Sequence, residues 1–225
     1  MRPLTDLTPK PLLQAGGCSL IEWQIRRLVA AGISEIAVNV SHLGEQIVAA
    51  LGNGHALGAR IRYSHEASAL ETAGGIALAL PLLGDGCFVA TNADIYCDFD
   101  FSGLTGISRQ LSIDSSPARV AHLVLVPNPE HHPKGDFSLS PSGRLIAGDG
   151  ERLTFSGIGV YRPEFFASVG PGERRALGPM LHAAVARGEV SGERFEGLWM
   201  DIGTPERLEQ LRTLFRAGNG PGPQG

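Results

Sequence analysis

The sequence lacks the features that mark secreted, membrane-spanning and nucleic-acid-binding proteins. Its three cysteines, Cys18, Cys87 and Cys97, are odd in number and lack Cys-x-x-Cys spacing, which argues against disulfides and a zinc site. No apolar run approaches the roughly 20 residues that span a bilayer, and the N-terminus does not resemble a signal peptide. The chain has 19 basic and 23 acidic residues and no basic run, so its sequence offers no basic patch suited to neutralise the phosphates of a nucleic acid. We therefore expect a cytoplasmic protein that binds neither nucleic acid nor membrane.

Familiar catalytic constellations are also missing. The sequence has no recognisable Ser-His-Asp or Cys-His arrangement, no internal repeat and no coiled-coil heptads. The adjacent histidines His131 and His132 have no neighbours that complete a metal-ligand set, so a solvated loop is favoured there. The composition is that of an ordinary globular protein, 43% hydrophobic and 19% charged over 225 residues, which is long enough to bury a core.

The first hundred residues alternate between helical and extended patterns. Ser19 and Glu22 form a capping box that opens a helix, Gly32 ends it, and Ser41 opens a second helix. A loop is expected at 71–75, followed by a short helix to Leu80. Pro81 is interpreted as the residue that breaks this helix. Short apolar strands are expected at 36–40, 60–64 and 87–92. Strands that alternate with helices predict βαβ crossovers and a Rossmann-like α/β fold with a mostly parallel mixed sheet.

The pattern changes after about residue 119 and predicts an antiparallel extension. Strands are expected at 120–126, 136–140, 145–146 and 153–161. A helix is expected at 180–187, and Thr204-Pro205 caps and starts the last one. The Gly- and Pro-rich tail at 218–225 is predicted to be disordered.

Two segments contain residue types that suit phosphate binding. Prolines on both sides of Lys10 fix the backbone, which is a low-entropy way to point a cation at a phosphate. An exposed lysine in a linker explains the same pattern. Gly74-Gly75, before an expected helix, would let a ligand approach backbone N–H groups, although a plain glycine turn explains them equally well.

Two aspartates are candidate ligands of a hard cation. Asp94 follows an apolar strand, at the end where open α/β sheets bind their ligands. It would there hold a cation that bridges phosphate oxygens, or it would simply cap the following turn. Asp201 precedes the helix that Thr204 caps, where it would serve as a polar turn residue or as a second metal ligand. Magnesium usually takes one or two carboxylates plus substrate phosphates.

The order and spacing of these motifs resemble the sugar-1-phosphate nucleotidyltransferases. The matching motifs are R-P-L-T-x-x-x-P-K-P-L, then E-T-A-G-G, then N-A-D at a strand end, and finally W-x-D-x-G-T-P. The similarity extends to about Leu214. Within the family, the runs at 70–75, 135–137, 153–157 and 199–201 resemble the N-acetylmuramate-1-phosphate uridylyltransferases of peptidoglycan recycling.

The resemblance implies a reaction and a set of site residues. The oxygen of a sugar 1-phosphate attacks the α-phosphate of a nucleoside triphosphate and expels pyrophosphate, without a protein nucleophile. The residues implied to face the nucleotide phosphates are Arg2 and Lys10, and those implied to hold Mg²⁺ are Asp94 and Asp201. The residues implied to line the base and sugar pocket are Glu71, Thr72, Gly75 and Asn92, with Asp136 at the sugar.

One departure from the family concerns the beginning of the chain. Family members open with a hydrophobic strand and a loop similar to L-A-A-G-x-G-x-R, whose N–H groups cradle the triphosphate. The sequence begins just after this position, so the expected fold has its first strand missing, and a misplaced start is favoured over a real absence. Weak activity is expected of the chain as given.

The expected organisation is one nucleotidyltransferase domain at 1–217, with a nucleotide half at about 1–100 and a sugar half at about 119–200. UTP and N-acetylmuramate 1-phosphate are the favoured substrates, and the protein is expected to be a monomer or a weak dimer. Two alternatives stay open. One is the same chemistry on glucose-, mannose- or glucosamine-1-phosphate, and the other is a catalytically inactive module that binds sugar nucleotides.

Overall fold

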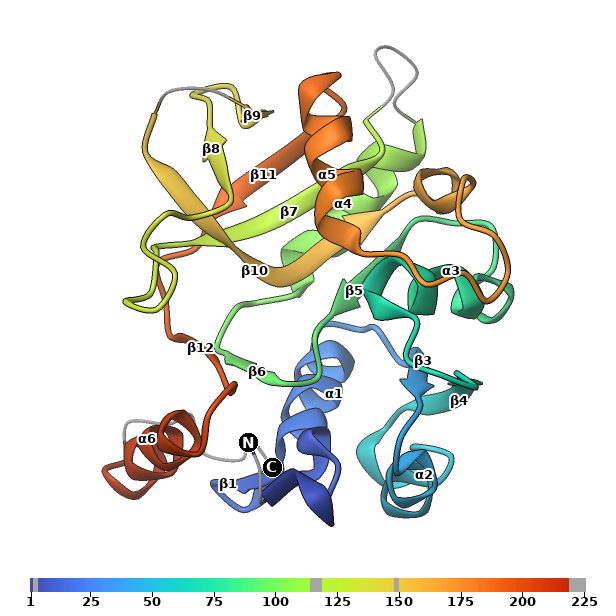
Figure 1. Cartoon of the computed structure of the whole chain (residues 1–225), viewed down its shortest axis with the longest axis vertical. Helices are drawn as coiled ribbons and strands as arrows, with labels where there is room; N and C mark the ends of the chain where they lie inside the picture. The colour runs from blue at the N-terminus through green and yellow to red at the C-terminus, as the bar shows by residue number, and fades with distance from the viewer. Residues whose placement is uncertain (2–3, 114–118, 148–149, 219–225) are drawn as a thin grey trace. The chain divides into compact units, whose positions relative to one another are not determined.

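The computed structural model describes residues 1, 4–113, 119–147 and 150–218. Helices and strands alternate along the chain (Figure 1), which confirms the predicted α/β class. The chain divides into two compact units, each discontinuous in sequence. The first unit comprises Met1–His65, Asn92–Phe101 and Gly197–Gly225, and the second comprises Glu66–Thr91 and Ser102–Glu196. The tail predicted to be disordered lies outside the described residues, except for Gly218.

In the residues that the structure describes, the first unit contains pairs of strands and three α-helices. Its strands are β1 (Gln14–Ala15), β2 (Cys18–Ser19), β3 (Glu35–Val40), β4 (Arg60–His65), β6 (Ile95–Cys97) and β12 (Trp199–Asp201). Its α-helices are α1 (Leu20–Ala30), α2 (Gly44–Leu51) and α6 (Pro205–Arg216). Its 3-10 helices are η1 (Leu4–Asp6), η2 (Lys10–Leu12) and η3 (His55–Leu57).

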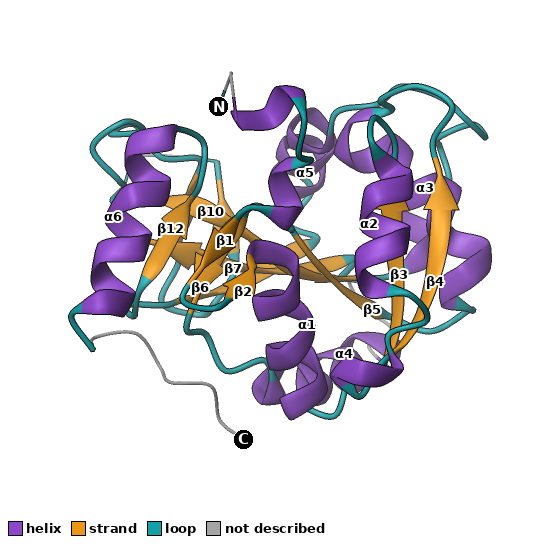
Figure 2. Ribbon diagram, turned by 90° about the horizontal axis from the view of Figure 1, so that it is seen from below, coloured by secondary structure: helices purple, strands orange, loops and turns teal. Residues whose placement is uncertain are grey.

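The pair β3–β4 is parallel and confirms the predicted βαβ crossover. The two strands pair in register along their whole length, with α2 between them in sequence and beside them in space (Figure 2). Ile47 and Leu51 of α2 are buried in the same apolar cluster as Val38 and Val40 of β3, because i and i+4 positions share one helix face. α2 begins at Gly44, three residues later than predicted, because Leu43 has a left-handed φ of 57°.

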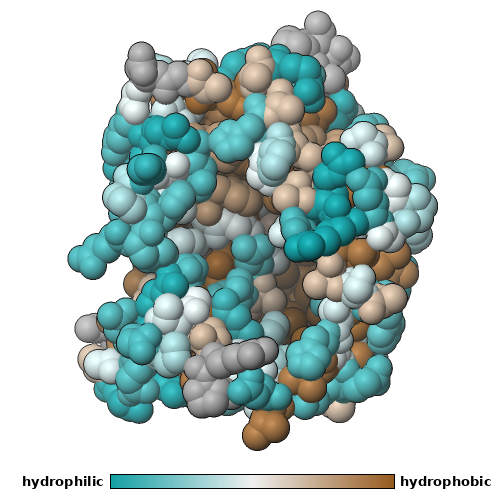
Figure 3. Space-filling model, in the orientation of Figure 1, coloured by the Kyte–Doolittle hydropathy of each residue, from teal (hydrophilic) through white to brown (hydrophobic). Residues whose placement is uncertain are grey.

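A second apolar cluster positions the ends of β6 and β12. The predicted capping box of α1 is confirmed, because the backbone N–H groups of Ser19 and Glu22 each donate to the side chain of the other residue. Trp23 of α1 stacks on Phe215 of α6, with ring centroids 5.0 Å apart, and both contact Tyr96 of β6 edge-on. This packing fixes β6 between two helices. The outward surface over α6 is mainly hydrophilic (Figure 3).

The second unit is built on a six-stranded sheet. Its strands are β5 (Phe88–Thr91), β7 (Ala121–Val126), β8 (Phe137–Leu139), β9 (Leu145–Ile146), β10 (Arg152–Tyr161) and β11 (Val190–Arg194). The strand order is β11-β7-β10-β8-β9, with β5 also paired to β10. Its helices are α3 (Glu71–Leu83), α4 (Ser102–Ile113), α5 (Leu177–Ala186) and the 3-10 helix η4 (Pro163–Phe166).

The mixed sheet is confirmed, but parallel pairing is less extensive than predicted. Among the described strands, only β3–β4 and β7–β11 pair in parallel, whereas β10 is antiparallel to β5, β7 and β8. β10 spans ten residues with its register shifted between Phe155 and Gly159, so it pairs with several strands at once. The expected antiparallel extension is thus organised around one long bulged strand.

Two expectations for the second unit are corrected, and one of its helices was not expected. Residues 71–75 form the first turn of α3 rather than a loop, and Pro81 lies inside this helix rather than ending it. Pro81 lacks the N–H group that would donate to the carbonyl of residue 77, and α3 ends two residues later at Leu83, so the loss is confined to the last turn of the helix. No helix was expected at α4, because Gly103 and Gly106 weaken its helical pattern. Its buried Leu104 and Leu111 nevertheless share one face.

Two features that the sequence was expected to lack are membrane-spanning helices and disulfides, and the described residues bear on both. No helix there is long and apolar enough to cross a membrane. The three cysteines are free thiols, and burial raises the pKa of Cys97 to about 12.

Candidate active site

Lys10 and Asp94 meet in the first unit. Pro9 precedes η2 in an extended conformation, and Lys10 begins this helix. The Lys10 ammonium donates a hydrogen bond to Asp94 Oδ2 at 2.5 Å, although the two residues are 84 positions apart in sequence. The two side chains are 26% and 38% exposed, so this ion pair remains accessible to ligands from solvent. Two residues selected by separate motifs therefore lie in direct contact.

Asp94 and Asp201 lie at the same end of one strand pair. β6 and β12 are antiparallel, with Asp201 opposite Ile95. The Asp94 carbonyl extends this ladder by accepting the N–H of Ile202 at 2.9 Å. Both carboxylates are about one-third exposed. The structure thus brings the two predicted metal ligands to neighbouring backbone positions within one unit.

Arg207 holds the Asp201 carboxylate from the first turn of α6. Thr204 caps this helix by accepting the Arg207 N–H at 3.2 Å, and Pro205 begins it, as predicted. The Arg207 guanidinium then folds back and forms an ion pair with Asp201. Gly203 leaves room for it, because a Cβ there would collide with the guanidinium. The predicted motif around Asp201 therefore includes a cation that the sequence interpretation missed.

The donor set at this end of the ladder is suited to magnesium. Among the described residues, no group of three or more His, Cys, Asp or Glu side chains could enclose a metal ion. Two carboxylates without thiolate or imidazole partners match a hard cation that draws its remaining ligands from water and substrate phosphates. Each carboxylate has a protein cation as its partner, so an incoming metal ion would compete with Lys10 and Arg207.

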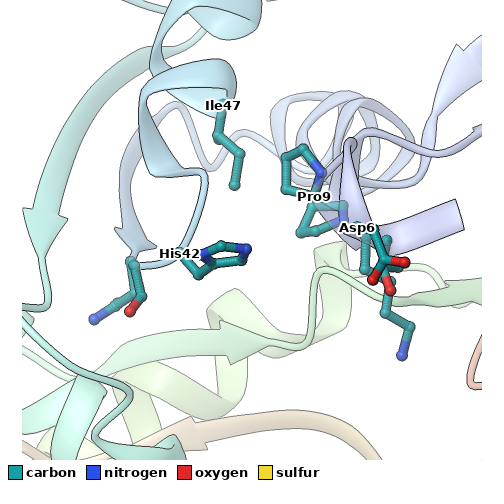
Figure 4. Close-up of a pocket in the computed structure, with 9 residues that line it drawn as sticks. Asp6, Pro9, His42 and Ile47 are labelled. Carbon is teal, nitrogen blue, oxygen red and sulfur yellow. The ribbon is translucent and has the colours of Figure 1, made fainter. Parts of the chain in front are cut away.

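A pocket of about 650 Å³ adjoins Lys10 in the same unit. The residues that line it are Thr5, Asp6, Pro9, Lys10, Pro11, Asn39, Ser41, His42 and Ile47. His42 extends from the turn after β3 toward Pro9 and Asp6, and Ile47 of α2 lies above it (Figure 4). The sequence interpretation missed the wall formed by residues 39–42. This wall could have been found from the pair Ser41-His42, which directly follows an expected strand. Ligands bind at this end of the strands in α/β folds.

Glu71 and Thr72 belong to the second unit, at the start of α3. Both are exposed, and Glu71 has a left-handed φ of 60°, which is unusual for a residue other than glycine. Its carboxylate pairs with Arg174 at 2.7 Å. A strained residue with an exposed carboxylate at a helix start is compatible with a ligand-binding role.

The first glycine of the pair behind Glu71, Gly74, packs closely within the protein. The N–H groups of Ala73 and Gly74 donate to the Arg175 carbonyl at 3.0 and 3.1 Å. A Cβ at Gly74 would collide with the Glu173 carbonyl. The backbone that approaches Gly74 closely is therefore the chain's own, and the Gly74 N–H, one of the two that were interpreted as available to a ligand, is already bonded within the protein. Gly75 is buried, and its predicted role stays a prediction.

Asp136 supports the bulge of β10. Its Oδ2 accepts the Phe155 N–H at 2.8 Å, and its Oδ1 lies 3.1 Å from His132 Nε2. Its backbone carbonyl accepts a hydrogen bond from Arg152 at 2.7 Å. These contacts give the carboxylate a structural task in addition to the predicted contact with a sugar. His132 therefore has a side-chain partner, where only a solvated loop was expected.

The remaining predicted residues are placed as follows. Asn92 is exposed in the first unit, two residues before Asp94. Arg2 lies outside the described residues. Lys10, Asp94 and Asp201 therefore gather in the first unit with Asn92, whereas Glu71, Thr72, Gly75 and Asp136 belong to the second.

Comparison with known proteins gives similarity over nearly the whole chain. A family model described as nucleotidyl transferase matches residues 1–131. The N-acetylmuramate alpha-1-phosphate uridylyltransferase of Neisseria meningitidis serogroup B is 48% identical over 220 residues, which cover 96% of this chain and 94% of that protein. The enzyme of the same name from Caulobacter vibrioides is 34% identical, over 92% of this chain and 88% of that protein. A mannose-1-phosphate guanyltransferase from Aspergillus fumigatus is 29% identical, over 92% of this chain and 58% of that protein.

Solved structures share the fold at low sequence identity. A Bacillus anthracis structure assigned as a glucose-1-phosphate thymidylyltransferase aligns with a TM-score of 0.83 at 19% identity, covering 96% of this chain and 90% of that one. HddC from Yersinia pseudotuberculosis aligns with a TM-score of 0.75 at 17% identity, covering 92% of this chain and 90% of that one. These likenesses support the predicted Rossmann-like α/β fold.

Proposed function

Because the chain belongs to the nucleotidyl transferase family, we propose that it transfers a uridylyl group from UTP to N-acetylmuramate 1-phosphate and releases pyrophosphate. The observation that carries this proposal is 48% identity, over nearly the full length of both chains, to a Neisseria relative named for that activity. The cluster of Lys10, Asp94 and Asp201 in the first unit supplies the charges that such a reaction needs. We further propose that the protein acts in the cytoplasm as a monomer or a weak dimer.

In this reaction the protein aligns two phosphates and neutralises their charge. The sugar phosphate oxygen attacks the α-phosphorus, the bond to the β-phosphate oxygen breaks, and pyrophosphate leaves with the electron pair. Bound Mg²⁺ would supply charge neutralisation at the phosphate oxygens. Asp94 and Asp201 would hold the ion, and Lys10 and Arg2 would face the nucleotide phosphates. No protein nucleophile is required.

The residues of the second unit have roles in substrate binding in this proposal. Glu71, Thr72 and Gly75 would contact the base and sugar, and the same role is proposed for Asn92 of the first unit. Asp136 would contact the sugar. The conformation of Glu71 supports a functional role, because a strained backbone persists where the surrounding structure enforces it.

The test is pyrophosphate release from UTP and N-acetylmuramate 1-phosphate in the presence of magnesium, with the UDP-sugar identified by mass spectrometry. Turnover that needs both substrates supports the proposal, even at a low rate. Asp94→Asn should abolish it, because a neutral amide does not replace a carboxylate ligand. Asp98→Asn is the matched control, since Asp98 is exposed, lies four residues further along and should be dispensable. Turnover retained in Asp94→Asn would remove Asp94 from the metal site.

A second candidate is the same chemistry on another sugar. The mannose-1-phosphate guanyltransferase relatives favour it, at 29% identity over 92% of this chain for the Aspergillus fumigatus protein. A matrix of UTP, GTP and dTTP against muramate, glucose, mannose and glucosamine phosphates separates the two candidates. Preference for GTP and mannose 1-phosphate would overturn the uridylyl assignment. Tight binding of UDP-N-acetylmuramate without turnover of any pair would favour an inactive binding module.

A further inference from the structure

Two basic side chains beside Asp136 carry positive charges that the described protein does not neutralise. Arg152 begins β10 and is exposed, and its guanidinium donates to the Asp136 backbone carbonyl at 2.7 Å. Lys134 is exposed in the turn two residues before Asp136. Among the described residues, neither cation forms an ion pair with a carboxylate. The arginines of this unit that do pair with a glutamate are Arg174, Arg175, Arg187 and Arg194.

The carboxylates of the same two segments leave these cations unpaired. Glu151 precedes Arg152 in the sequence, but its carboxylate pairs with Arg194 at 2.9 Å. Both oxygens of the Asp136 carboxylate have protein partners, the Phe155 N–H and the His132 ring. The positive charges of Lys134 and Arg152 are therefore available to an anionic group that binds beside Asp136.

Asn128 ties the turn that carries Lys134 to the start of β10. Its amide Nδ2 donates to the Arg152 carbonyl at 2.9 Å and to the Pro133 carbonyl at 3.3 Å. Its Oδ1 accepts the Thr154 hydroxyl at 2.9 Å. The backbone positions from which the two cations extend are thus fixed to each other, which lowers the entropic cost of binding one ligand between them.

We propose that Lys134 and Arg152 bind the lactyl carboxylate of N-acetylmuramate 1-phosphate and so select an acidic sugar over a neutral one. The inference rests on the proposed function and on the proposed contact between Asp136 and the sugar. A guanidinium presents paired donors that match the two oxygens of a carboxylate, and the ammonium adds a second charge. Neither the motifs nor the names of the relatives assign a role to these two residues.

The test compares two sugars that differ only in the lactyl group. The quantity measured is kcat/KM for N-acetylmuramate 1-phosphate divided by kcat/KM for N-acetylglucosamine 1-phosphate, at saturating UTP and magnesium. Arg152→Gln and Lys134→Gln should each lower this ratio about threefold to tenfold, because the carboxylate loses a hydrogen bond from a charged donor. The loss should appear in KM for the acidic sugar, since the lactyl group is remote from the reacting phosphate. Arg152→Lys should retain more of the preference than Arg152→Gln.

Arg109→Gln is the matched control. Arg109 is an exposed cation on α4 of the same unit, so the variant removes the same charge away from Asp136 and should leave the ratio unchanged. If no pair of substrates turns over, the same ratio is taken from the dissociation constants of UDP-N-acetylmuramate and UDP-N-acetylglucosamine, measured by isothermal titration calorimetry. Failure of the proposed reaction is thereby distinguished from failure of the sugar selection.

The outcomes decide the inference on sugar preference alone. A ratio that is unchanged in both variants overturns it, and so does an equal loss on both sugars, which would indicate a structural role. A ratio that falls in only one variant overturns the shared contact. An unsubstituted protein that prefers the neutral sugar also overturns it, although uridylyl transfer itself would stand. If Arg152→Gln does not fold, Lys134→Gln and Arg152→Lys decide.

Discussion

Removal of the Lys10 charge should increase the affinity of the nucleotide-free protein for divalent cations. The Lys10 ammonium contacts Asp94 Oδ2 at 2.5 Å, where a metal ion would bind. A cation that binds Asp94 must break this ion pair and then stay near a positive charge. Lys10→Met keeps most of the aliphatic stem and removes the charge. The same variant should bind UTP more weakly, because its phosphates lose a cation.

The expected change in metal affinity depends on how far the Lys10–Asp94 ion pair is exposed to solvent. An ion pair between partly exposed side chains is worth about 0.2–1 kcal/mol. A divalent ion about 4 Å from the ammonium is repelled by roughly 2 kcal/mol at the dielectric constant of water, and salt reduces this. A net gain of about 1–2 kcal/mol corresponds to about 5–30-fold tighter metal binding.

The assay is calorimetric titration of magnesium into protein without nucleotide, followed by titration of UTP at saturating magnesium. Lys134→Met is the matched control, because it removes one positive charge from an exposed loop of the second unit. Metal affinity that is unchanged or weaker in Lys10→Met would refute the competition between Lys10 and the ion.

Three further predictions concern stability and reactivity. Gly203→Ala should lower the free energy of unfolding in urea by about 1 kcal/mol, because its Cβ displaces Arg207 from Asp201, and the cost should shrink in an Arg207→Ala background. Glu71→Gly should be more stable than Glu71→Ala by about 1 kcal/mol in the same assay, because glycine adopts the left-handed φ without strain, and equal stability would contradict this. Cys97 should resist a thiol reagent at pH 8 in the folded protein while Cys18 and Cys87 react, because its pKa of about 12 keeps it protonated, and rapid labelling would contradict its burial.

Local signals predicted the elements that depend on neighbouring residues. Ser19 and Glu22 define the start of α1 through their mutual hydrogen bonds, and Thr204-Pro205 defines the start of α6. These caps are found from the sequence because both partners lie within one helical turn.

Contacts between distant segments could not be predicted in the same way. The start of α3 is held by the backbone of Arg175, about a hundred residues later, so residues 71–75 appeared to be a glycine loop. Asp94 was correctly expected after a strand, but its contact with Lys10 and its position next to Asp201 depend on the β6–β12 pair. Both strands of this pair are three residues long, which is too short for a periodic signal.

The most direct test is a double-mutant cycle on the two carboxylates at the end of the β6–β12 ladder. Manganese binding in the presence of UTP is measured by electron paramagnetic resonance for Asp94→Asn, Asp201→Asn and the double variant. If both carboxylates hold one ion, each single substitution weakens binding at least about tenfold and the double substitution adds little more. Losses that simply multiply, or a single variant that binds as tightly as the unsubstituted protein, would contradict a shared metal site.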